Sequence, residues 1–160
     1  MKRLLKIITI LILAFSSQFI SARKIFVTSV HSLRLAIKVA RSRDIIIIKK
    51  GTYRFRKHII IRRKRNLRIY GQKRVNLLQE NPQDRVILIE KSKNIKIKNI
   101  RFSHDSPNKE CIGDVLHIEK SRNIKLYQSE FDGSGTIGIS ILNSKNIKVY
   151  RSKIHNNTYK

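Results

Sequence analysis

The chain has 160 residues, a length that suits one domain, and 36 Lys and Arg against 10 Asp and Glu give a formal net charge of +26 at pH 7. Such an excess points to an anionic partner: a polyanionic polysaccharide, a phosphate-rich surface or nucleic acid. The one cysteine, Cys111, excludes an intramolecular disulfide.

Residues 1–22 have the pattern of a secretory signal peptide: a basic start, an apolar run from Ile7 to Phe15, and a small residue, Ala22, at the cleavage position. The apolar run is shorter than the roughly 20 residues that span a bilayer. We therefore expect an exported protein, whether periplasmic, at the cell surface or secreted, with no membrane span after cleavage. Export disfavours nucleic acid as the native partner.

An amphipathic helix is predicted near the start of the mature chain. Leu33, Ala36, Ile37 and Ala40 recur at helical spacing, and Ser32 is a candidate N-cap. We expect residues 23–44 to form an N-terminal strand and a capping helix that covers the open end of a stack of coils. An isoleucine strand at 45–48 and a turn over 50–53 then begin residues 45–160, which we expect to form those coils.

Four similar segments follow, and each begins with Asn before an alternation of apolar and mostly basic residues. They are KRNLRIYG (64–71), SKNIKIKNIRF (92–102), SRNIKLYQSEF (121–131) and SKNIKVYRSKI (144–154). The Asn residues are 28, 29 and 23 positions apart. Asn tolerates the left-handed backbone of a sharp bend, and stacked Asn side chains can form an amide ladder. Serines two positions earlier, in the last three copies, are expected to stack as well.

Each repeat supplies three short apolar strands between polar bends, and no repeat can bury its own apolar face. Parallel stacking buries one continuous core, with an advance of about 4.8 Å per coil. The predicted fold class is therefore all-β, a parallel β-solenoid. A leucine-rich repeat, whose period is also in the twenties, is the main alternative, but its Leu framework is absent.

The cap and first coil resemble those of right-handed parallel β-helix proteins, the pectate-lyase-like group, and the Asn-Ile-x-Ile repeats resemble its later coils. The residues that carry the cap resemblance are Ser32, Leu33, Ala36, Ile37, Ala40, Asp44, Ile46, Ile48, Gly51 and Tyr53. The resemblance covers nearly all of 25–155 and implies a right-handed parallel β-helix with an N-terminal capping α-helix. Arg43 departs from the family's usual Gly before Asp44, which allows a different turn there.

Alignment of the repeats on Asn predicts two columns on one outer face. The first column is basic and holds Arg68, Lys96, Lys125 and Lys148. The second holds Tyr70, Lys98, Tyr127 and Tyr150. Tyr rings beside a row of cations suit acidic sugars, through stacking and charge. A solvated charged face is the alternative interpretation of the same pattern.

The catalytic candidates follow the third strand of a repeat: His104, Asp105, Asp132 and His155. Asp132 and His155 occupy the same column, so we expect them to lie about one coil apart. The resemblance implies that a lyase would use a Lys or Arg base, often with calcium held by clustered carboxylates. The candidate metal ligands are Asp105, Glu110, Asp114 and Asp132. A hydrolase would instead need two carboxylates at a fixed separation.

Our preferred interpretation is an exported β-helix module, non-catalytic and without a cofactor, that binds an acidic polysaccharide or cell-surface glycan on its basic, Tyr-bearing face. The alternative is a polysaccharide lyase-like or hydrolase-like enzyme, with calcium if it is lyase-like. A further alternative is a truncated copy without activity. The last coil ends at Ile154 without a visible cap, so end-to-end self-association through that coil is also expected.

Overall fold

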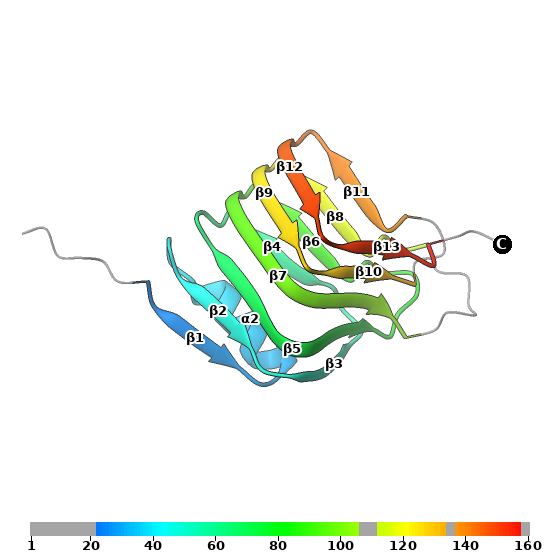
Figure 1. The fold of residues 1–160 in the computed structure, drawn as a ribbon, viewed down its shortest axis with the longest axis horizontal. Coiled ribbons are helices and arrows are strands. Elements are labelled where there is room, and N and C mark those ends of the chain that lie inside the picture. The colour runs from blue at the N-terminus through cyan, green and yellow to red at the C-terminus, as the bar shows by residue number, and fades with distance from the viewer. Residues whose placement is uncertain (1–21, 106–111, 134–136, 158–160) are drawn as a thin grey trace, which may run out of the picture.

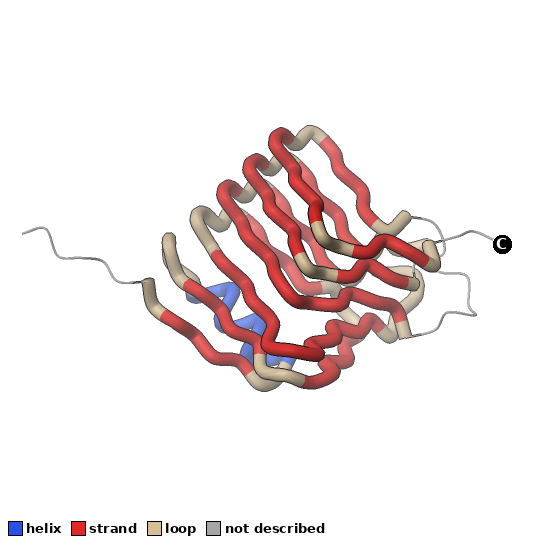
Figure 2. The backbone as a smooth tube through the Cα atoms, viewed as in Figure 1, coloured by secondary structure: helices blue, strands red, loops and turns tan. Residues whose placement is uncertain are grey.

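The computed structural model describes residues 22–105, 112–133 and 137–157. They form a parallel β-solenoid of about five turns with one short helix at its N-terminal end (Figure 1; Figure 2). The segment interpreted as a signal peptide lies outside the described residues, apart from Ala22. No helix in the described ranges has the length and apolar character needed to cross a membrane.

Each full coil has three faces. The first face contains β1 (Lys24–Val27), β2 (Ile45–Ile48), the first halves of β5 (Arg68–Gln79) and β7 (Lys93–His104), β9 (Arg122–Tyr127) and β12 (Lys145–Tyr150). The second face contains β3 (Gly51–Phe55), the second halves of β5 and β7, β10 (Glu130–Asp132) and β13 (Lys153–His155). The third face contains β4 (Ile59–Arg62), β6 (Ile87–Glu90), β8 (Leu116–Glu119) and β11 (Ile139–Leu142).

The corner before the first face carries the predicted asparagine ladder. Asn66, Asn94, Asn123 and Asn146 have φ of 52°, 57°, 57° and 55°, in the left-handed region. The side-chain amides of the last three donate to the side-chain oxygen of the Asn one coil earlier, at 2.7, 2.9 and 3.1 Å, and the Asn66 amide donates to Ser42 Oγ at 2.8 Å. The ladder satisfies polar groups that the bend would otherwise leave without a partner, and it sets the register of neighbouring coils.

The predicted serine stack is also present. The backbone N–H of Ser92 donates to Ser121 Oγ, and that of Ser121 donates to Ser144 Oγ, both at 3.0 Å. Each of these hydroxyls in turn donates to the carbonyl oxygen two residues earlier. Ser92 and Ser121 are buried, so these bonds replace the hydration that both groups lose.

The core consists of columns of apolar side chains, one from each coil. Ile61, Ile89, Ile118 and Ile141 stand in one register on the third face. On the second face the rings of Phe102 and Phe131 stack with centroids 5.3 Å apart and an interplanar angle of 2°. A fully buried side chain of this kind stabilises the fold by roughly 1.5–3 kcal/mol.

The N-terminal end of the core is covered by helix α2 (Val30–Val39), which contacts β1 to β4. Leu33, Ala36 and Ile37 are its buried residues, as predicted. The predicted N-cap is wrong: Ser29 caps the helix, and Ser32 is the third helical residue of the same capping box. The two serines exchange hydrogen bonds at 3.0 Å, from Ser32 N–H to Ser29 Oγ and from Ser29 N–H to Ser32 Oγ, so both carry an N-cap signal.

The turn before β2 places Arg43 in the left-handed region of the backbone. Arg43 adopts φ = 74°, the backbone that Gly would supply, and Asp44 accepts a hydrogen bond from the Arg41 N–H at 2.8 Å. The turn predicted over 50–53 is shorter, because Gly51, with φ = 148°, already begins β3.

The last coil leaves its apolar columns partly open. Ile141, Val149 and Ile154 are 37–52% exposed, although the equivalent Ile118, Leu126 and Phe131 in the preceding coil are buried. End-to-end association through this coil stays a prediction.

Candidate functional site: a basic face, a groove and a charged cluster

The predicted basic column is present on the first face. Arg68 lies opposite Lys96, Lys96 opposite Lys125, and Lys125 opposite Lys148 in adjacent parallel strands. Within the described ranges, no salt bridge includes any of these four side chains. The column is therefore a row of cations whose counter-charges come from solution.

The tyrosine column runs beside it. Tyr127 and Tyr150 stack with ring centroids 5.3 Å apart and an interplanar angle of 6°, and Lys98 Nζ lies 5.4 Å from the Tyr127 ring centroid. Burial, together with the neighbouring Tyr127, raises the pKa of Tyr70. Ile47 and Phe26 continue the column toward the N-terminus. Apart from Lys98, the tyrosine column and its continuation therefore offer aromatic and apolar surface along the full length of the first face.

A groove of about 720 Å³ lies at the corner between the first and second faces. We call it the corner groove. Its lining residues are Lys73, Arg74, Val75, Lys98, Asn99, Ile100, Arg101, Gln128, Ser129, Glu130, Arg151 and Lys153. Six of them are basic and one is acidic, so the groove is strongly cationic.

The groove owes its shape to β5. Between the paired positions Tyr70 and Val75 the chain has four residues, whereas the next coil turns the same corner with Asn99 alone, so β5 carries a three-residue insertion. Gly71 lets the insertion pass close to that coil, since a Cβ there would lie 2.2 Å from the Asn99 carbonyl oxygen. The inserted Lys73 and Arg74 form part of the groove wall.

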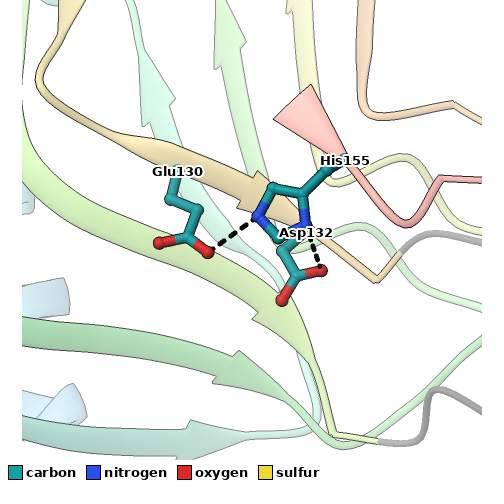
Figure 3. A group of neighbouring side chains, drawn as sticks. All are labelled: Glu130, Asp132 and His155. Carbon is teal, nitrogen blue, oxygen red and sulfur yellow. Dashed lines mark hydrogen bonds and ion pairs between the residues drawn. The ribbon is translucent and has the colours of Figure 1, made fainter. Parts of the chain in front are cut away.

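A charged cluster lies on the second face beside the groove (Figure 3). His155 Nε2 is 2.8 Å from Glu130 Oε1, and His155 Nδ1 is 3.4 Å from Asp132 Oδ1. Arg101 pairs with Asp132 and lies 3.5 Å from Glu130. Asn156 donates to Asp132 Oδ1 at 2.9 Å. The predicted proximity of Asp132 and His155 is thus present, with Glu130 as a third member.

Glu130, Asp132 and His155 each offer one ligand atom within 4.8 Å of the others, so together they could hold a metal ion. The observed contacts favour a different use. The two nitrogens of one imidazole face two different carboxylates, and Arg101 already supplies a cation to both. We therefore regard the cluster as an ion-pair network with acid–base groups.

The other candidate residues lie elsewhere. Asp105 pairs with Arg54, and Asp114 Oδ2 is 2.9 Å from His117 Nδ1. Glu110 lies outside the described residues. The described calcium candidates thus occupy three separate ion pairs, with Asp132 in the third, which does not fit one site of six to eight oxygens.

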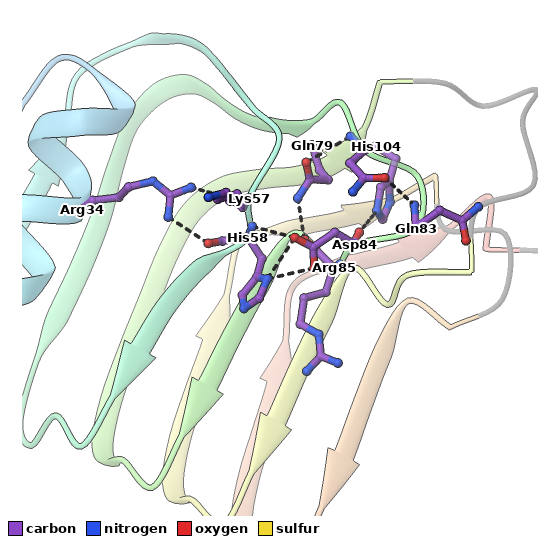
Figure 4. Close-up of polar contacts among 9 residues, drawn as sticks. Arg34, Lys57, His58, Gln79, Gln83, Asp84, Arg85 and His104 are labelled. Carbon is purple, nitrogen blue, oxygen red and sulfur yellow. Dashed lines mark hydrogen bonds and ion pairs between the residues drawn. The ribbon is translucent and has the colours of Figure 1, made fainter.

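His104 is buried and belongs to a network around Asp84 (Figure 4). Its Nε2 lies 2.8 Å from the Asp84 carbonyl oxygen, and burial lowers its pKa. Burial also opposes ionisation of the Asp84 carboxyl, but hydrogen bonds from His58 and Arg85 lower its pKa overall. His104, the last residue of β7, therefore holds the connection between β5 and β6 rather than joining Asp132.

Comparison with known proteins identifies the architecture. No family model and no curated protein matches the chain. Among solved structures, it is similar to a mutant pectin methylesterase in complex with a hexasaccharide, with 12% sequence identity, a TM-score of 0.60 and 81% of this chain covered. The chain spans 49% of the length of that structure. The protein has the right-handed parallel β-helix fold.

The sequence analysis missed the corner groove of this β-helix. A signal was present: Asn99, Gln128 and Arg151 each follow a ladder Asn by five residues, and all three have left-handed φ. The contribution of Arg74 depends on the three-residue insertion in β5, which breaks that spacing.

Proposed function

We propose that this β-helix binds an acidic polysaccharide along its first face and does not catalyse its conversion. The basic column would meet the carboxylates of the polymer, and the tyrosine column would stack against its sugar rings. The observation that carries the proposal is the row of four in-register cations beside stacked Tyr127 and Tyr150. The similar solved structure holds a hexasaccharide, which supports a saccharide ligand.

Electrostatics supports an anionic ligand. Unit charges one strand spacing apart, about 4.8 Å, repel by about 1 kcal/mol in water, and salt screens part of that repulsion. A polyanion lying across the coils would replace this repulsion with attraction at every coil. Export, expected from residues 1–22, would place the protein where such polymers occur.

The test is affinity for polygalacturonate, with highly methyl-esterified pectin as the weakly charged comparison. Lys96→Gln/Lys125→Gln/Lys148→Gln should weaken binding to polygalacturonate by at least about tenfold and reduce its salt dependence. The matched control is Lys38→Gln/Lys50→Gln/Lys57→Gln, which removes three exposed charges near the N-terminal end. Equal affinities of the two triple variants would disprove the proposal.

Catalysis at the charged cluster is the second candidate function. It is favoured by the imidazole of His155 between two carboxylates, with Arg101 in contact with both. Such a set could move a proton during lyase or hydrolase action on an acidic polysaccharide. The test follows unsaturated uronate by ultraviolet absorbance, and new reducing ends, on a panel of polyuronates and glycosaminoglycans. Activity that Asp132→Asn abolishes would establish this candidate, and no activity on the panel would reject it for those substrates.

A further inference from the structure

We propose that the corner groove is a second anion-binding subsite, which takes the carboxylates of a short acidic oligosaccharide segment. This inference rests on the proposed function, because the segment would belong to the polymer held on the first face. The corner groove differs from the binding surface on the first face in its location, in its binding residues and in the length of ligand that it accepts.

The charge of the groove requires a ligand with several negative groups. Lys73, Arg74, Lys98, Arg101, Arg151 and Lys153 line a volume of about 720 Å³. The one acidic lining residue, Glu130, is already engaged by His155 at 2.8 Å and by Arg101 at 3.5 Å. A ligand with one charge would leave most of these cations uncompensated, whereas three neighbouring carboxylates would pair with several of them.

The chemistry of the groove suits carboxylates. Three of the six cations are arginines, whose planar guanidinium can bind a carboxylate through two parallel hydrogen bonds. Arg101 is held in place by its ion pair with the buried Asp132. Arg74 and Arg151 project from corners of left-handed backbone, with φ of 62° and 50°. The bases of these side chains are thus set by the fold before any ligand arrives.

The shape of the groove limits the length of the ligand. The first face continues over all the coils, but the three-residue insertion in β5 places Lys73 and Arg74 at one end of the groove. Arg151 and Lys153 of the last coil line its other end. The lining therefore belongs to four successive coils, which suits an oligosaccharide of a few sugars.

The groove and the first face are continuous through Lys98. This residue belongs to the tyrosine column, where its Nζ lies over Tyr127, and it also lines the groove. A polymer that crosses the tyrosine column can thus place its end, or a branch, in the groove without leaving the protein surface.

The test uses trigalacturonate as the short probe and polygalacturonate as the long one, both measured by isothermal titration calorimetry. The groove variant is Arg74→Asn/Arg151→Asn, since Asn tolerates left-handed φ and removes the charge without straining the corner. The control, Arg43→Asn/Arg63→Asn, removes the same charge at two exposed corners with φ of 74° and 54° outside the groove. We expect about tenfold weaker trigalacturonate binding in the groove variant and a change within about twofold in the control.

The outcomes separate this inference from the proposed function. Unchanged trigalacturonate affinity in the groove variant would overturn the inference, even if the Lys96, Lys125 and Lys148 substitutions abolish polymer binding. Conversely, groove-dependent trigalacturonate binding with polymer binding that ignores those lysines would overturn the proposed function alone. Tripolyphosphate tests the alternative source of negative groups: groove-dependent binding of tripolyphosphate without binding of trigalacturonate would overturn the carbohydrate assignment.

Discussion

The inside and the outside of this coil use the same repeat with opposite energetic results. Inside the coil and at its asparagine corner, like residues stack to advantage: Phe102 on Phe131, Asn94 on Asn123, Ser92 on Ser121. Outside, Lys96 stacks on Lys125 and Lys125 on Lys148, which brings like charges together. The comparison shows that stacking of like residues in register does not by itself stabilise a coil. The basic column on the outer face therefore needs an explanation other than folding stability.

The largest effect is expected from breaking the inner ring stack. Phe131→Ala should lower the free energy of unfolding by about 3–5 kcal/mol, because the ring is fully buried and its loss leaves a cavity beneath Phe102. Urea denaturation would measure the change. Phe131→Leu, which retains most of the apolar volume, should cost less; equal costs would show that the cavity is not the cause.

The asparagine ladder should come next. Asn123→Ala removes one hydrogen bond to Asn94 and one from Asn146, and it forces Ala into φ = 57°. We expect a loss of about 2 kcal/mol. Asn123→Gly removes the same bonds but accepts the backbone, so its cost should be smaller by the strain alone. Thermal unfolding of both variants would separate the two contributions, and an equal loss would assign all of it to the bonds.

Removal of charges from the basic column should change the free energy of unfolding in the opposite direction. Without ligand and at low salt, Lys96→Gln/Lys125→Gln/Lys148→Gln should raise the free energy of unfolding by about 1 kcal/mol, since it removes like-charge neighbours. The gain should shrink as salt is added. Chemical denaturation at two ionic strengths would measure it. A variant less stable than the wild type at low salt would show that the lysine stems contribute more by packing than their charges cost.

The smallest effect concerns pH. Burial lowers the folded-state pKa of His104, so below about pH 6.5 the unfolded chain binds a proton that the folded chain does not. Stability should therefore fall as pH drops below that value, and His104→Gln should remove this part of the slope. The readout is the difference between the two curves of unfolding free energy against pH. Parallel curves would mean that His104 is protonated in the folded protein as well.

Much of the fold could be predicted because the sequence of each repeat indicates the geometry of its own coil. The Asn at each ladder position predicted both the left-handed bend and the amide contact, and the alternation after it predicted which side chains lie outside. The N-cap was missed because Ser29 and Ser32 serve one capping box, and spacing alone does not tell which serine begins the helix. The corner groove was not predicted because the insertion within residues 71–74 interrupts the spacing of the repeat at the position where the groove forms.

The candidate site was only partly predictable. Strand register predicted that Asp132 and His155 would be neighbours, but the choice of ion-pair partners depends on side-chain reach, which a sequence alignment does not contain. Asp105 thus pairs with Arg54, 51 residues away, instead of joining Asp132. Asp114 likewise pairs with His117, three residues later in β8.

The asparagine ladder also makes the coil a unit that can be removed whole. Asn94 and Asn123 share φ = 57° and the same position in the ladder. Deleting residues 94–122 would join Lys93 directly to Asn123, which could then donate to Asn66 as Asn94 does now. Each column of stacked side chains would become shorter by one strand spacing, and the two ends of the protein would keep the same residues. We therefore expect that the length of this protein can change by whole coils while the asparagine corner is kept.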